Sequence, residues 1–78
     1  MEIEVKTETG KKLLRLKVGK KESISRIFSF VFPHRENIHI LKEEHFVLRT
    51  VYPIVDFHHN DQRTLKELNF KKKKNFNL

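Results

Sequence analysis

The chain opens with MEIEVKTETGK (residues 1–11), and this stretch decides the fold. Ile3 and Val5 alternate with charged residues, which is the two-residue period of a strand that is buried on one face. The chain then turns at Gly10, which can adopt a positive φ. A second alternating run follows over residues 14–18. The opening therefore predicts a β-hairpin.

An amphipathic helix is predicted after the hairpin. Its apolar residues recur at positions i, i+3, i+4 and i+7, namely Ile24, Ile27, Phe28 and Val31. Ser23 precedes them and is suited to cap the first turn. Pro33 disfavours helical backbone at the residue before it, so the helix should end near Phe32. The pattern therefore predicts a helix over residues 24–32.

The second half of the chain predicts shorter elements. Residues 46–52 are rich in β-branched and aromatic side chains and predict a strand, and Pro53 either ends it or marks it as an edge strand. Residues 54–55 can form one more short strand. Residues 64–70 have the apolar spacing of a compact turn. Residues 75–78 alternate briefly, as in a last strand that pairs with the first one.

The order of these elements is that of a β-grasp, a mixed sheet of four to five strands over one helix. The predicted fold class is therefore α+β, as a single domain over residues 1–78. A chain of this length buries only about 60–65% of its unfolded surface, so its core has little to spare. The expected core is Ile3, Val5, Leu14, Leu16, Val18, Ile24, Ile27, Val31, Phe46, Leu48, Leu65, Phe70 and Phe76.

Two segments of the chain resemble the ubiquitin family. The first is the opening hairpin, in which the matching residues are Ile3, Val5, Lys6, Thr7, Thr9, Gly10 and Lys11. The second is RTLKELNF (residues 63–70), in which the matching residues are Arg63, Thr64, Leu65 and Asn69. The segment between them matches only in its pattern. Two anchors in the right order, with a helix between them, imply a ubiquitin-like β-grasp.

The resemblance also implies a function. Ubiquitin relatives dock proteins through an exposed face of the sheet, so the implied function is that of a non-catalytic protein-interaction domain. Its expected partners are proteins of the ubiquitin and proteasome pathway, or another protein. The residues expected to contact them are Glu8 in the first turn, Val47 and Arg49 on the third strand, and Asn77 on the last strand. The positions that the family uses as chain-linkage sites are occupied by Lys6, Lys11 and Lys72.

Conjugation is not expected of the chain as written. Family members that are conjugated end in a flexible Gly-Gly tail, whose carboxylate is activated and transferred. This sequence has no glycine after Gly19, and Leu78 matches a position near the middle of the family's last strand. We therefore expect a non-conjugated domain, such as the amino-terminal part of a longer protein. The alternative is a modifier whose diglycine tail lies beyond Leu78.

The charge of the chain leaves a second function open. Seventeen Lys and Arg residues stand against ten Asp and Glu, which gives a net charge of +7. The run of Lys71, Lys72, Lys73 and Lys74, expected in the loop before the last strand, could contact the phosphates of a nucleic acid. The neighbouring Phe70 and Phe76 are expected in the core and not as stacking platforms. A basic nucleic-acid-binding β-grasp domain is therefore the alternative to protein docking.

No catalytic or metal-binding group is expected. The sequence has no cysteine, no glycine-rich phosphate loop and no Gly-x-Ser-x-Gly motif. His58 and His59 are adjacent, but no further ligands follow at zinc spacing, so a solvated loop is the simpler interpretation. We therefore predict no enzymatic activity, no cofactor and no metal. We also expect a monomer in the cytoplasm, the nucleus or both, without a membrane partner, since no apolar run approaches the roughly 20 residues that span a bilayer.

Overall fold

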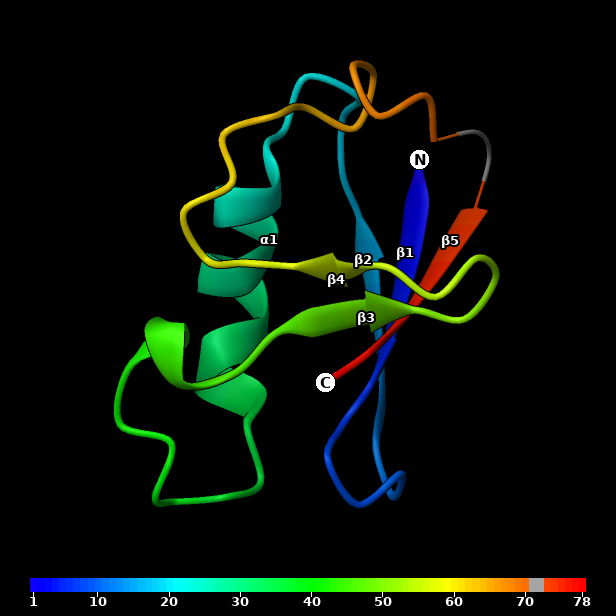
Figure 1. Ribbon diagram of the computed structural model, residues 1–78. Coiled ribbons are helices and arrows are strands. Elements are labelled where there is room, and N and C mark those ends of the chain that lie inside the picture. Colours follow the sequence, from blue (N-terminus) through cyan, green and yellow to red (C-terminus); the bar gives the residue numbers. More distant parts are fainter. Residues whose placement is uncertain (71–72) are drawn as a thin grey trace.

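The computed structural model describes residues 1–70 and 73–78, and these form an α+β fold of the β-grasp type (Figure 1). Within the described residues, a five-stranded mixed sheet in the order β2-β1-β5-β3-β4 lies against one α-helix. The strands are β1 (Glu2–Lys6), β2 (Leu13–Lys17), β3 (Leu48–Thr50), β4 (Asp56–Phe57) and β5 (Lys73–Asn77), and the helix is α1 (Ile24–Val31). This architecture confirms the predicted fold class.

The predicted hairpin at the start of the chain is confirmed. β1 and β2 are antiparallel, with Val5 opposite Leu14. The Gly10 amide donates a 2.8 Å hydrogen bond to the Thr7 carbonyl, and Gly10 has a φ of 75°, which a residue with a Cβ rarely adopts. β5 pairs with the other edge of β1 in parallel, with Val5 opposite Phe76. The two ends of the described chain therefore meet in the middle of the sheet.

The amphipathic stripe forms helix α1. Ser23 Oγ accepts a 3.3 Å hydrogen bond from the Arg26 amide, as expected of a helix N-cap. The residues of the stripe are fully buried: Ile24, Ile27, Phe28 and Val31. The helix ends one residue before the predicted end, and a 3-10 turn over Phe32–His34 follows it. Pro33 explains this ending, because it has no amide hydrogen to continue the α-helical ladder.

The core lies between α1 and the inner face of the sheet. Its buried residues are Ile3, Val5, Ile24, Ile27, Phe28, Val31, Leu48, Phe57, Leu65 and Phe76. Several predicted core residues pack against this cluster but are only partly buried, namely Leu14, Leu16, Val18, Phe46 and Phe70. Leu14 and Leu16 keep some exposure because β2 is an edge strand. Phe57, which is absent from the expected core, is buried in β4, where the rings of Phe70 and Phe76 meet it edge-on.

The strand boundaries in the second half of the chain differ from the prediction. β3 covers three residues, so Val47 lies one residue before the strand and not within it. The next strand is β4, and the predicted strand at residues 54–55 is instead part of the hairpin tip. The register pairs Leu48 with Phe57 and places both side chains in the core. β3 therefore starts and β4 ends at this buried pair.

The tip of the β3–β4 hairpin is closed by Thr50. Its hydroxyl donates a 2.6 Å hydrogen bond to the Pro53 carbonyl and accepts a 3.2 Å bond from the Val55 amide. The Tyr52–Pro53 peptide bond is cis. Because the tip projects beyond the paired strands, the five successive apolar residues 51–55 are all exposed.

The last strand begins earlier than predicted. Because β5 starts at Lys73, Lys73 and Lys74 belong to a strand and not to the loop before it. Residues 64–70 form the compact turn that was predicted, and the buried Leu65 anchors it through a 3.0 Å hydrogen bond from its amide to the Glu22 carbonyl. Across residues 1–70 and 73–78, no helix has the length and apolarity needed to cross a membrane.

Candidate functional site

The face of the sheet that points away from α1 carries mostly charged and polar side chains, and we call it the outer face. Successive residues of a strand point to opposite faces, so the buried Ile3 and Val5 place Glu4 and Lys6 on the outer face. The strand register adds Leu13, Arg15 and Lys17 of β2, Asn75 and Asn77 of β5, Arg49 of β3 and Asp56 of β4. The strand order thus gathers residues from both ends and the middle of the chain on one surface.

Ion pairs hold several of these side chains. The Arg49 guanidinium donates two hydrogen bonds to the Asp56 carboxylate, at 2.6 and 3.1 Å. These bonds hold the pKa of Asp56 below its ordinary value and raise the pKa of Arg49. Arg15 Nε lies 3.8 Å from a carboxylate oxygen of Glu4 across the β1–β2 pair. Exposed pairs contribute little to stability, but they fix the direction in which each charge is presented.

Three of the four residues predicted to contact a partner lie around one depression of about 240 Å³. We call it the Arg49 depression, and it is lined by Val47, Arg49, Asn77 and Leu78. Arg49 lies opposite Asn77 in the β3–β5 pair. The Leu78 amide donates a 2.9 Å hydrogen bond to the Lys6 carbonyl, which fixes this end of the chain beside β1. The long-range pairing of β3 with β5 therefore assembles the depression.

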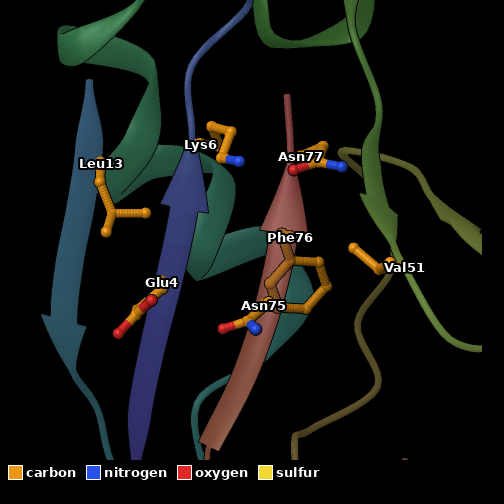
Figure 2. Close-up of a pocket in the computed structure, with 7 residues that line it drawn as sticks. All are labelled: Glu4, Lys6, Leu13, Val51, Asn75, Phe76 and Asn77. Carbon is orange, nitrogen blue, oxygen red and sulfur yellow. The ribbon is translucent and has the colours of Figure 1, made fainter. Parts of the chain in front are cut away.

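A second depression, of about 270 Å³, adjoins the first at Asn77 (Figure 2). It lies over β1 and β5, where Glu4, Lys6 and Asn77 supply its polar groups. Leu13 from β2 and Val51 from the hairpin tip stand on its two sides and are 47% and 40% exposed. The two depressions together form a shallow surface of polar groups between apolar side chains.

Glu8, the fourth predicted residue, lines neither depression and holds a neighbouring loop. Its carboxylate accepts hydrogen bonds from the backbone amides of Glu36 (3.0 Å) and Asn37 (2.5 Å). In return, the Glu36 carboxylate accepts hydrogen bonds from the hydroxyls of Thr9 and Thr7 and from the Thr9 amide. The bond from the Thr9 hydroxyl, followed by that from Thr7, holds the pKa of Glu36 below its ordinary value. Sequence reasoning missed this clamp because its two carboxylates are 28 residues apart.

Comparison with protein families and curated proteins assigns no family to this chain. No protein-family model matches the chain, and no curated protein matches it either. The β-grasp architecture therefore rests on the structure, and the resemblance to the ubiquitin family stays a prediction from the sequence.

The lysines singled out from the sequence have different surroundings. Lys6 is exposed on the outer face, and Lys11 is exposed just after the first turn. Lys71 and Lys72 lie outside the described residues, as does the side chain of Lys73. Lys74 is half-buried, and its ammonium lies 4.9 Å from the centre of the Phe70 ring. Of the four lysines predicted to contact phosphate, only Lys74 therefore has a described side chain.

His58 and His59 lie in the loop after β4, where His58 is exposed and His59 half-buried. In the part of the chain that the structure describes, no three His, Cys, Asp or Glu side chains are grouped as they are around a metal ion. Asp61 in the same loop is paired with Arg63, whose guanidinium donates a 2.6 Å hydrogen bond to it. The hydrogen bonds from Arg63 hold the pKa of Asp61 below its ordinary value.

Proposed function

We propose that this chain is a non-catalytic protein-interaction domain that docks a partner on the outer face of its sheet. The Arg49 depression carries the proposal, because Val47, Arg49 and Asn77, selected from the sequence alone, surround one site. A protein of the ubiquitin or proteasome pathway is the partner to which the resemblance to ubiquitin points. In this proposal the chain as written is not conjugated to other proteins, and it acts in the cytoplasm or the nucleus.

The chemistry of this surface suits a protein partner. Arginine is over-represented among the residues that dominate binding energy at protein interfaces. The Arg49 side chain is 54% exposed, and its ion pair with Asp56 fixes its orientation. A guanidinium that is oriented before binding loses less freedom when a partner's carboxylate meets it. Leu13 and Val51 add apolar area nearby. A shallow surface of this kind fits a folded partner better than a small molecule, which needs an enclosing pocket.

An NMR titration tests the proposal. The isotope-labelled chain is titrated with purified ubiquitin-receptor subunits of the proteasome, and backbone amide shifts are followed. We expect the largest shifts at Val47, Arg49 and Asn77. Arg49→Glu should weaken binding by about tenfold or more, as expected for a central arginine whose charge is reversed.

The matched control is Arg26→Glu on the exposed side of α1. Arg26 is a similarly exposed arginine (62%) that also pairs with a carboxylate, that of Glu22 at 3.6 Å. This variant should leave the affinity unchanged within about twofold. Equal losses from both substitutions, or shifts confined to the helix side of the sheet, would show that the outer face is not the docking surface.

A basic nucleic-acid-binding domain is the second candidate, and one observation favours it. Across residues 1–70 and 73–78, no ion pair joins the Lys74 ammonium to a carboxylate. The net charge of +7 adds to the attraction for phosphates. A steep fall of affinity with salt would distinguish this candidate from protein docking.

A further inference from the structure

A cleft of about 370 Å³ opens on the side of the sheet opposite the outer face, between the β3–β4 hairpin and the compact turn of residues 64–70. Its apolar wall is formed by Val55 and Phe57 from the hairpin and by Leu68 and Phe70 from the turn. Arg63 and Lys74 also line it. We call this the hairpin cleft.

The cleft exists because the side chains on the inner face of the β3–β4 hairpin form a row that extends beyond the hydrophobic core. Leu48 and Phe57 face each other in this row and are 0% and 4% exposed. The next pair is Thr50 and Val55, joined by a 3.0 Å hydrogen bond from the Thr50 amide to the Val55 carbonyl. Thr50 is buried, but Val55 is 40% exposed. The row therefore extends past the core and ends at a side chain that is exposed to solvent.

The cationic groups of the cleft sit on aromatic rings. The Lys74 ammonium lies 4.9 Å from the centre of the Phe70 ring, and the Arg63 guanidinium lies 5.9 Å from that of Phe57. Arg63 is paired with Asp61, whereas no ion pair joins Lys74 to a carboxylate in the described parts of the chain. Lys74 thus presents an unmatched positive charge beside apolar side chains.

The cleft differs from the outer face in that its described lining contains no carboxylate. On the outer face, Arg15 and Arg49 each pair with a carboxylate on the neighbouring strand, Glu4 and Asp56. None of the described residues that line the cleft is acidic. Apolar surface and unmatched positive charge therefore coincide in the cleft, and a ligand that complements it must be both apolar and anionic.

We infer that the hairpin cleft is a second docking site, which binds an acidic peptide segment carrying a large apolar side chain. The apolar side chain packs between Val55 and Phe70, and flanking Asp or Glu side chains meet Lys74 and Arg63. Such a carboxylate gains more from Lys74 than from Arg63, since Asp61 already holds Arg63. This site lies beyond the proposed docking on the outer face, and neither site requires the other.

Fluorescence anisotropy with three labelled ten-residue peptides tests the inference. The first peptide carries a Phe and a Leu among Asp and Glu residues. The second replaces the Phe and the Leu by Ser, and the third replaces each acidic residue by Lys. We expect the first peptide to bind at least about tenfold more tightly than either of the others, because each of those lacks one of the two complementary features.

Two pairs of variants locate the site. Val55 and Val51 belong to the same hairpin tip and are both 40% exposed, but Val55 lines the hairpin cleft and Val51 lines a depression of the outer face. Val55→Asp should weaken binding of the first peptide by about tenfold, and Val51→Asp by less than about twofold. Lys74→Glu should weaken it by a similar factor, and Lys17→Glu on the remote edge strand β2 should not.

Several results would overturn the inference. One is equal binding of the acidic peptide that lacks Phe and Leu, which would mean that charge alone attracts it. Another is an equal loss from Val51→Asp and Val55→Asp in variants whose amide spectra show the native fold. A third is binding to vesicles that contain phosphatidylserine without binding to any peptide. If Val55→Asp does not fold, the Lys74→Glu and Lys17→Glu pair decides the matter, because both lysines lie at the surface.

Discussion

Glu8 and Glu36 show how single residues position a loop in this protein. Each carboxylate accepts hydrogen bonds from the segment that carries the other, so the first turn and the loop after α1 are tied twice. Hydrogen bonds to a carboxylate stabilise its charged form. The strength of this tie therefore depends on the ionisation of Glu36.

The first prediction concerns the pH dependence of stability. The pKa of Glu36 is lowered in the folded state from its ordinary value of 4.5. The stabilisation of the fold by the ionised carboxylate is therefore fully present above that pH. The contribution is lost as the pH falls through the lowered pKa, where the carboxyl becomes protonated in the folded chain. Glu36→Gln should therefore lower the urea midpoint near neutral pH, and its difference from the unchanged chain should shrink below about pH 4.5.

Urea titrations of both proteins at several pH values measure this difference. Asp56 and Asp61 also have lowered pKa values, but both proteins contain them, so their effect cancels. Glu44→Gln, at an exposed position of the 3-10 turn Glu43–His45 before β3, serves as the control and should change the urea midpoint little near neutral pH. A gap between Glu36→Gln and the unchanged chain that is constant from neutral to acidic pH would contradict the prediction.

The β3–β4 hairpin is the element whose local sequence gave the least guidance. Residues 46–52 are all compatible with a strand, yet only residues 48–50 pair as one. The strand starts at Leu48, whose burial was expected, but its partner Phe57 was not among the expected core residues. By contrast, β1 is paired on both sides, and its Ile3 and Val5 are fully buried.

Amide hydrogen exchange should separate these two elements. The amides of Ile3 and Val5 are expected to exchange slowest, because opening them requires β1 to leave two neighbouring strands. The amides of the exposed residues 51, 52 and 54 at the hairpin tip should exchange fastest within the sheet region. If residues 2–6 exchanged as fast as the tip in a folded sample, the central position of β1 would be wrong.

At the scale of the whole molecule, the net charge of +7 makes the salt dependence of binding the measurement that separates the two candidate functions. A nucleic-acid interface through the lysine run would make affinity fall steeply with salt. The logarithm of the binding constant would fall against the logarithm of the salt concentration with a slope of about −0.7 to −0.9 per phosphate contact. Protein docking at the Arg49 depression relies on one arginine beside apolar side chains, so its affinity should fall less steeply with salt.

The prediction uses a variant in which Lys71, Lys72, Lys73 and Lys74 are all changed to Gln. We expect binding of the unchanged chain to single-stranded RNA to be negligible at physiological salt. We also expect the variant to keep its affinity for a partner at the Arg49 depression. Micromolar RNA binding whose salt slope is reduced by about three in the variant would instead favour the nucleic-acid candidate.

The sequence by itself determined the elements that local periodicity encodes. The two-residue period of the opening specified the first hairpin, and the stripe from Ile24 to Val31 specified the helix and its buried face. The position of Pro33 specified the end of that helix to within one residue. Three of the four residues selected for docking also lie together, because Val47, Arg49 and Asn77 were chosen on strands that do become neighbours.

Only the tertiary structure decided which segments pair and where the core ends. The pairing of β5 with β3, the burial of Phe57, and the tie between Glu8 and Glu36 all join residues far apart in the chain. The hairpin cleft likewise exists because the apolar row that includes Val55 extends past the residues that cover it. The physical reason is that local patterns fix backbone conformation and sidedness, whereas contact partners are chosen by the packing of the whole core.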